Sequence, residues 1–189
     1  MKIYLTLAAA VLALSACNNT EDTAAPAADT ASKVDAAMPA EETAMVSPTD
    51  AAGYIAKAGA GDLWEIESSK ALLSKSTNAE VKKFAQMMVD HHTDSTEKVK
   101  AAAMAANLTV APPKLAPDQE KTLEEVKKAN ANAIDALYVR HQKTAHDAAL
   151  ALHQGFATGG DTEALKNAAG EIAPVVQKHI AELGKLSAG

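Results

Sequence analysis

The chain has 189 residues, of which 44 are alanine, and only 3% are aromatic. Strands favour β-branched and aromatic side chains, whereas alanine, leucine, lysine and glutamate favour helices, so this composition excludes an all-β fold. The single cysteine, Cys17, excludes an intrachain disulfide framework and a zinc site built from thiolates. The formal net charge of −6 argues against a nucleic-acid partner, because binding phosphates requires a basic surface.

Residues 1–16 have the pattern of a secretory signal peptide. A positively charged start is followed by an apolar run over residues 3–14, which is too short for a permanent membrane span. One interpretation is an ordinary cleavage site near an ordinary cysteine. However, the quartet Leu-Ser-Ala-Cys that ends at Cys17 resembles the bacterial lipobox. This resemblance implies cleavage before Cys17, acylation of its thiol with palmitate-type chains and, because Asn18 follows, sorting to the outer membrane.

Residues 17–50 are predicted to be the lipidated cysteine followed by a disordered acidic tether. The segment is rich in Ala, Thr, Pro, Asp and Glu, and it has too few large apolar side chains to offset chain entropy by burial. Most of the net negative charge lies here, so the remaining residues, 51–189, are nearly neutral. We expect the lipid to anchor the protein in the membrane, with the folded domain in the periplasm.

Residues 51–189 predict an all-α fold with four long amphipathic helices, because apolar side chains recur at helical spacing. The long helices are expected over residues 49–75, 79–106, 133–157 and from Asp161 onward. A charged stretch over residues 118–129 predicts a short helix before the third long one, after a proline-rich loop. Asn78 and Asp161 are the expected N-caps of the second and last long helices. Four such helices predict a four-helix bundle.

Several runs of this sequence resemble DUF4142, a family of ferritin-like bacterial envelope proteins of unknown function. The likeness covers about residues 50–186 in the family's order. It is carried by DLWEIESS (62–69), VKKFAQMMVDHHT (81–93), IDALY (134–138), His146, ALHQ (151–154), GD (160–161) and PVVQKH (174–179). The resemblance implies a ferritin-like helical bundle exported to the envelope, and it implies no established reaction.

A ferritin-type di-iron centre is not expected. Such a centre needs two Glu-x-x-His pairs, and the residue three positions before each of the six histidines is not a carboxylate. The chain also has no Gly-x-Ser-x-Gly nucleophile motif and no glycine-rich phosphate loop before a helix. We therefore predict no catalytic residue.

A looser metal site of histidines and a carboxylate is an alternative, because neutral imidazoles suit zinc, copper, iron or nickel. Counted from a turn near Gly159, His141 and His179 lie at nearly the same level, whereas His146 and His179 differ by about 10 Å. The candidate ligands are Glu67, His91, His92, His141, His146 and His179. The other interpretation is that these groups satisfy one another by hydrogen bonds between helices. Asp135 and Tyr138 are predicted to form a polar pair with a partner helix.

Two functions remain open from the sequence. The first is a non-enzymatic, lipid-anchored envelope protein whose bundle binds or packs against a periplasmic protein partner, as a structural or stress-related module. The second is a metal-binding or redox bundle with a transition metal as cofactor. The expected partners are a periplasmic protein and, through the lipid, the membrane. No nucleic-acid partner is expected.

Overall fold

The computed structural model describes residues 49–186, and the predicted signal peptide, Cys17 and almost all of the tether lie outside the described residues. The described part is helical and contains no strand. Its elements are α1 (Ala51–Leu73), α2 (Ala79–Ala105), α3 (Pro117–Lys128), α4 (Ile134–Gly159) and α5 (Glu163–Leu186). The prediction of four long helices, with a short helix before the third of them, is confirmed.

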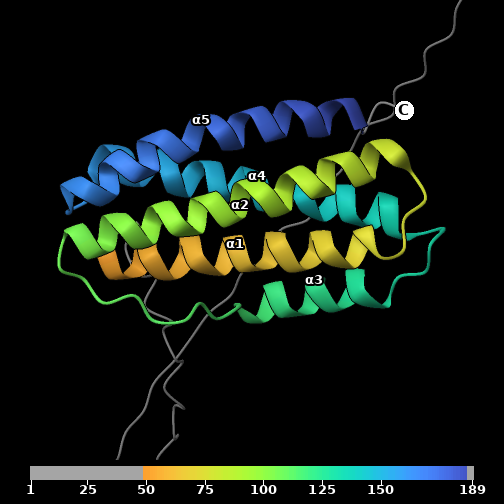
Figure 1. The fold of residues 1–189 in the computed structure, drawn as a ribbon, viewed down its shortest axis with the longest axis horizontal. Coiled ribbons are helices and arrows are strands. Elements are labelled where there is room, and N and C mark those ends of the chain that lie inside the picture. The colour runs from red at the N-terminus through yellow and green to blue at the C-terminus, as the bar shows by residue number, and fades with distance from the viewer. Residues whose placement is uncertain (1–48, 187–189) are drawn as a thin grey trace, which may run out of the picture. The chain divides into compact units, whose positions relative to one another are not determined.

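The four long helices form a bundle in which neighbouring helices run antiparallel (Figure 1). α1 packs against α2 and α4, and α5 packs against the same two helices. The short α3 lies outside this bundle against α1 and α4. The indole N–H of Trp64 on α1 donates to the Thr122 hydroxyl of α3 over 3.0 Å. Two buried side chains of α3, Leu123 and Val126, complete this contact.

The sequence predicts two N-caps, and the structure confirms one of them. The Asn78 side chain accepts hydrogen bonds from two backbone N–H groups in the first turn of α2, so the predicted N-cap is confirmed. Asp161 was expected to cap the last helix, but α5 begins at Glu163. The Asp161 carboxylate instead accepts a hydrogen bond from the hydroxyl of Thr162.

Apolar side chains fill the two ends of the bundle but not its middle. One apolar cluster includes Tyr54, Phe156 and Ile172, and the other includes Leu72 and Phe84. The buried polar side chains between them are Asp62, Glu65, Ser68, Ser69, His92, Ser95, Gln142, His146 and His179. Burying polar groups costs free energy unless each finds a partner, so this layer is where a functional site is expected.

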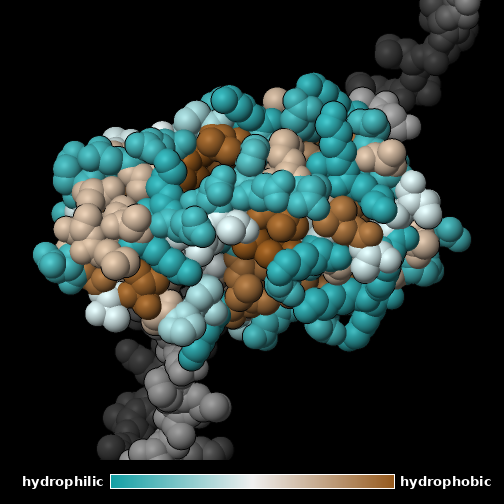
Figure 2. Space-filling view, viewed as in Figure 1, coloured by the Kyte–Doolittle hydropathy of each residue, from teal (hydrophilic) through white to brown (hydrophobic). Residues whose placement is uncertain are grey.

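The surface of the described bundle carries both polar and apolar side chains (Figure 2). On the face drawn in Figure 2 it is mostly hydrophilic, with apolar patches between the polar side chains. None of the described helices is both long enough and apolar enough to cross a bilayer. The helices therefore turn most of their large apolar side chains toward the bundle core.

We expect Gly160→Ala to lower the free energy of unfolding by about 1–3 kcal/mol, the usual cost of overpacking. A Cβ at Gly160 would lie 2.6 Å from both the carbonyl oxygen and a ring carbon of Phe156. Gly155 offers a matched control, because a Cβ there would meet nothing within 4 Å. Gly155→Ala should raise the free energy of unfolding by up to about 1 kcal/mol, because alanine is the better helix former. Urea unfolding that gives both variants the same sign would contradict this account.

Candidate metal centre

Three histidines from three different helices meet in the polar layer. His92 of α2, His146 of α4 and His179 of α5 are 5%, 0% and 2% exposed. One ring nitrogen of each residue lies within 4.8 Å of a ring nitrogen of both others. His146 Nε2 and His179 Nδ1 lie 3.2 Å apart, which is within hydrogen-bond distance. We call these three residues the histidine triad.

The remaining long helix, α1, supplies no member of the triad but places one carboxylate beside His92 and another beside His146. Asp62 and Glu65 lie three positions apart and therefore share one face of the helix. Asp62 Oδ1 is 2.8 Å from His92 Nδ1, and Glu65 Oε1 is 3.3 Å from His146 Nδ1. Each carboxylate thus takes the Nδ1 side of its histidine, which leaves the Nε2 side for another partner.

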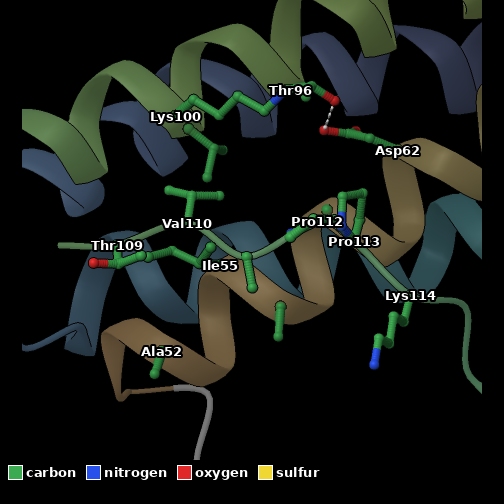
Figure 3. A pocket seen from close by; sticks show the side chains of 14 residues that line it. Ala52, Ile55, Asp62, Thr96, Lys100, Thr109, Val110, Pro112, Pro113 and Lys114 are labelled. Atoms are coloured by element: carbon green, nitrogen blue, oxygen red, sulfur yellow. Dashed lines mark hydrogen bonds between the residues drawn. The ribbon is translucent and has the colours of Figure 1, made fainter.

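Further hydrogen bonds hold both carboxylates in place. The Thr96 hydroxyl donates to Asp62 Oδ2 over 3.0 Å, the dashed bond in Figure 3. The Gln142 side-chain amide donates to Glu65 Oε2 over 2.5 Å, and the Gln142 carbonyl lies 2.9 Å from His146 Nδ1. Such outer partners fix the orientation of a ligating imidazole and make it a better donor.

His92 Nε2 is buried and has no hydrogen-bond partner among the described residues. Burial lowers the pKa of His92, but the hydrogen bond to Asp62 and the charges of Glu65 and Asp62 outweigh it, so the pKa is raised. With no other ligand, a protonated His92 leaves one N–H without an acceptor in the core. An unsatisfied buried donor of this kind is destabilising.

The other two members of the triad are neutral at pH 7. Burial lowers the pKa of His146, and the positive charge of His92 adds to this effect. Burial also holds the pKa of His179 well below its usual value, and electrostatic coupling to the neighbouring histidines, His92 first, adds to this effect. The neutral imidazole is the form that binds a metal ion.

This donor set fits a divalent ion of the late first transition row. Three neutral imidazoles suit zinc, copper and nickel, and nitrogens bound to a tetrahedral zinc ion lie about 3.4 Å apart. The 3.2 Å between His146 Nε2 and His179 Nδ1 is close to that spacing. Asp62 and Glu65 would offset the charge of the ion through His92 and His146. Three protein ligands leave a fourth position for water or a small molecule.

The structure brings three of the predicted ligands together and places two elsewhere. Glu67 is half-exposed, and its carboxylate lies 3.1 Å from the ammonium of Lys70. His141 turns away from the triad toward α3, where its Nε2 lies 3.0 Å from a Glu125 carboxylate oxygen. His91, the sixth candidate, is exposed but lies against the triad, with its Nδ1 2.8 Å from His179 Nε2.

His146 reaches His179 although their predicted levels differ. Counted from the observed helix ends, His146 lies 13 residues before Gly159 and His179 lies 16 residues after Glu163. The offset is therefore three residues, or about 4.5 Å, which two imidazole side chains can span. The larger predicted offset came from placing the turn at Gly159, which is the last residue of α4.

The predicted polar residues of α4 behave differently from each other. The Tyr138 hydroxyl forms a 2.7 Å hydrogen bond with the Ser69 hydroxyl of α1, which is the predicted contact with a partner helix. Asp135 does not share it, because its buried Oδ1 has no hydrogen-bond partner within the described chain. Tyr138 therefore joins α4 to α1 without Asp135.

Asp62 and Glu65 contact the triad, and the sequence analysis did not select them as candidate ligands. A pattern that would have found them is the alternation of three- and four-residue steps along α1. These steps connect Ile55, Ala58, Asp62, Glu65, Ser69 and Leu72, all of which are buried. The alternation marks one core-facing stripe whose middle is polar.

The comparisons with known proteins agree with this architecture. Residues 35–186 match the family described as Domain of unknown function (DUF4142). A DUF305 fragment from Deinococcus radiodurans superimposes with a TM-score of 0.64 at 11% identity, over 74% of this chain and 96% of that one. A Streptomyces coelicolor DUF305 protein, described as secreted, gives 0.61 at 13% identity, over 72% and 89%. These likenesses show the fold alone, and no curated protein matches the chain in sequence.

We expect the domain to lose stability as the pH falls from about 6.5 to about 4. Burial lowers the pKa of His153 from 6.5 to about 4, so the unfolded chain takes up a proton in this range before the folded chain does. His153 alone should lower the free energy of unfolding by about 3 kcal/mol across the range. Urea unfolding at several pH values measures this, and His153→Gln should lessen the dependence. A free energy of unfolding that rises as the pH falls would contradict the assignment.

Proposed function

The chain belongs to the DUF4142 family, whose membership assigns no activity, and we propose its function from the geometry of the site. The bundle is a module that binds one divalent transition-metal ion. His92, His146 and His179 are the proposed ligands. The observation that carries the proposal is the buried, unpartnered His92 Nε2 beside two neutral imidazoles. A metal ion gives that nitrogen the partner that the protein does not supply.

The proposed binding exchanges a proton for the ion. The raised pKa of His92 favours its protonated form, and a nitrogen can bind the ion only after it loses that proton. The positive charge of the bound ion then replaces that of the proton. Asp62 and Glu65, which contact His92 and His146, balance it. Affinity should therefore fall as the pH falls, because protons compete with the ion.

In the test, the metal-free full-length chain is titrated with Zn²⁺, Ni²⁺ or Cu²⁺. Calorimetry measures the affinity, and elemental analysis measures the number of ions bound per chain. We expect one ion per chain, with Cu²⁺ held more tightly than Ni²⁺ or Zn²⁺, the usual order for such donors. His92→Ala, His146→Ala and His179→Ala should each abolish stoichiometric binding. Asp62→Asn should weaken binding by about 10- to 100-fold, because it removes an outer partner of His92.

His141→Ala is the matched control. It removes an imidazole that also has a carboxylate partner but lies outside the triad. This variant should bind the ion as the unaltered chain does. Unchanged stoichiometric binding in the three triad variants, or no binding by the unaltered chain, would overturn the proposed function.

We also propose that this module is held at the bacterial outer membrane, facing the periplasm, by acyl chains on Cys17. The support is the Leu-Ser-Ala-Cys quartet, the apolar run before it and the acidic segment after it. Mass spectrometry of the mature N-terminus after expression in a bacterial host tests this. The expected species begins at Cys17 and carries acyl mass, and a free Cys17 thiol in the mature protein would overturn the anchor.

A further inference from the structure

The histidine triad is closed off from solvent, so an ion cannot reach it without passing other side chains. All three residues are at most 5% exposed. Four of the residues in contact with the triad are buried as well, and these are Asp62, Glu65, Phe84 and Gln142. Among the contacts described for the triad, His91 is the exposed partner that carries a metal-binding group.

His91 and His179 form a continuous path from the surface to the triad. His91 Nδ1 is 2.8 Å from His179 Nε2, and the two rings stack with centroids 5.1 Å apart at 20°. The other nitrogen of His179, Nδ1, is 3.2 Å from His146 Nε2. His179 therefore has one nitrogen toward the exposed histidine and the other toward the buried site.

We propose that His91 is the residue through which a divalent transition-metal ion enters and leaves the histidine triad, an inference that rests on the proposed function. At the surface, a His91 nitrogen replaces one water on the ion. His179 Nε2 then binds the ion. Rotation of the His179 ring about its Cβ–Cγ bond turns Nε2 to the side that Nδ1 occupied, which faces His146, and there His92 and His146 bind the ion. At each step one bond from the ion to nitrogen forms as one bond to water or to the previous histidine breaks, and the ion stays divalent.

The main alternative route is the groove between α1, α2 and the loop after α2. It has a volume of about 410 Å³ and reaches Asp62, which contacts His92 (Figure 3). However, apolar side chains form most of its walls, and the exposed Lys100 and Lys114 also line it. These lysines repel a cation, and Asp62, the carboxylate among the lining residues, is already hydrogen-bonded to His92 and Thr96, so the groove is the poorer route.

The variant His91→Gln distinguishes passage of the ion through His91 from a role in which His91 only orients His179. The glutamine side-chain NH2 group can still donate a hydrogen bond to His179 Nε2, but an amide is a poor ligand for these ions. His91→Ala removes both properties. Because His91 is exposed, neither change opens a cavity in the core, and thermal unfolding verifies that both variants fold.

The test measures exchange rates of Zn²⁺ in the full-length chain by stopped flow. Uptake is followed on mixing with Zn²⁺, and release is followed on mixing the loaded protein with excess chromogenic chelator. Both His91 variants should slow uptake and release by about tenfold or more, because the ion must then wait for a rarer opening of the bundle. The dissociation constant should change less than about threefold, since both rates fall together.

Two controls define the alternatives. His141→Ala removes an imidazole that is not on the path, and Ala56→Phe fills the groove; both should exchange Zn²⁺ at the rate of the unaltered chain. Unchanged uptake in His91→Gln would overturn the inference, as would slow uptake in Ala56→Phe alone. A weaker dissociation constant with unchanged uptake would show that His91 only orients His179, and would also overturn it. Absence of Zn²⁺ binding by the unaltered chain would overturn the proposed function as well.

Discussion

The four-helix bundle buries ionisable side chains at its centre, and the rest of the structure must offset the cost of burying them. Two apolar clusters at the ends of the bundle hold the four helices together. Between them, Asp62 and Glu65 of α1 face His92 and His146 of the neighbouring helices. The stability from the ends allows a polar centre that would otherwise be destabilising. The rigid middle turns of the helices also hold the donors more precisely than a loop would.

The chemistry of this centre resembles a metal site more than a structural network. In a structural network the groups satisfy one another, and most of this layer does so. Three buried atoms of this layer, His92 Nε2, Ser95 Oγ and Gln142 Oε1, have no hydrogen-bond partner within the described chain. Of these, His92 Nε2 is the imidazole nitrogen, and the Asp62 hydrogen bond leaves it on the other side of the ring. A protonated His92 also lies among histidines whose pKa values are lowered by burial. Under the proposed function, a proton and a metal ion are therefore alternative occupants of one position.

The sequence predicted the helices well because their signals are local. Apolar spacing, the Asn78 cap and the proline-rich loop all act within a few residues, and α1 to α5 follow them closely. The site was harder to predict because it depends on how four helices are rotated and offset against one another. His141 is one of the predicted ligands, yet its side chain contacts Glu125 of α3, which packs outside the bundle. The carboxylates that contact the triad are Asp62 and Glu65, and the predicted Glu67 projects toward solvent.

The chain shares its architecture with two DUF305 proteins at only 11% and 13% identity. Apolar ends determine the bundle, while a few central residues determine what it holds. The most direct test of the central claim is anomalous X-ray diffraction from crystals of the metal-loaded protein, recorded at the absorption edge of the metal. The account predicts one strong peak about 2 Å from a ring nitrogen of each of His92, His146 and His179. Peaks confined to the molecular surface, with none between these three histidines, would contradict it.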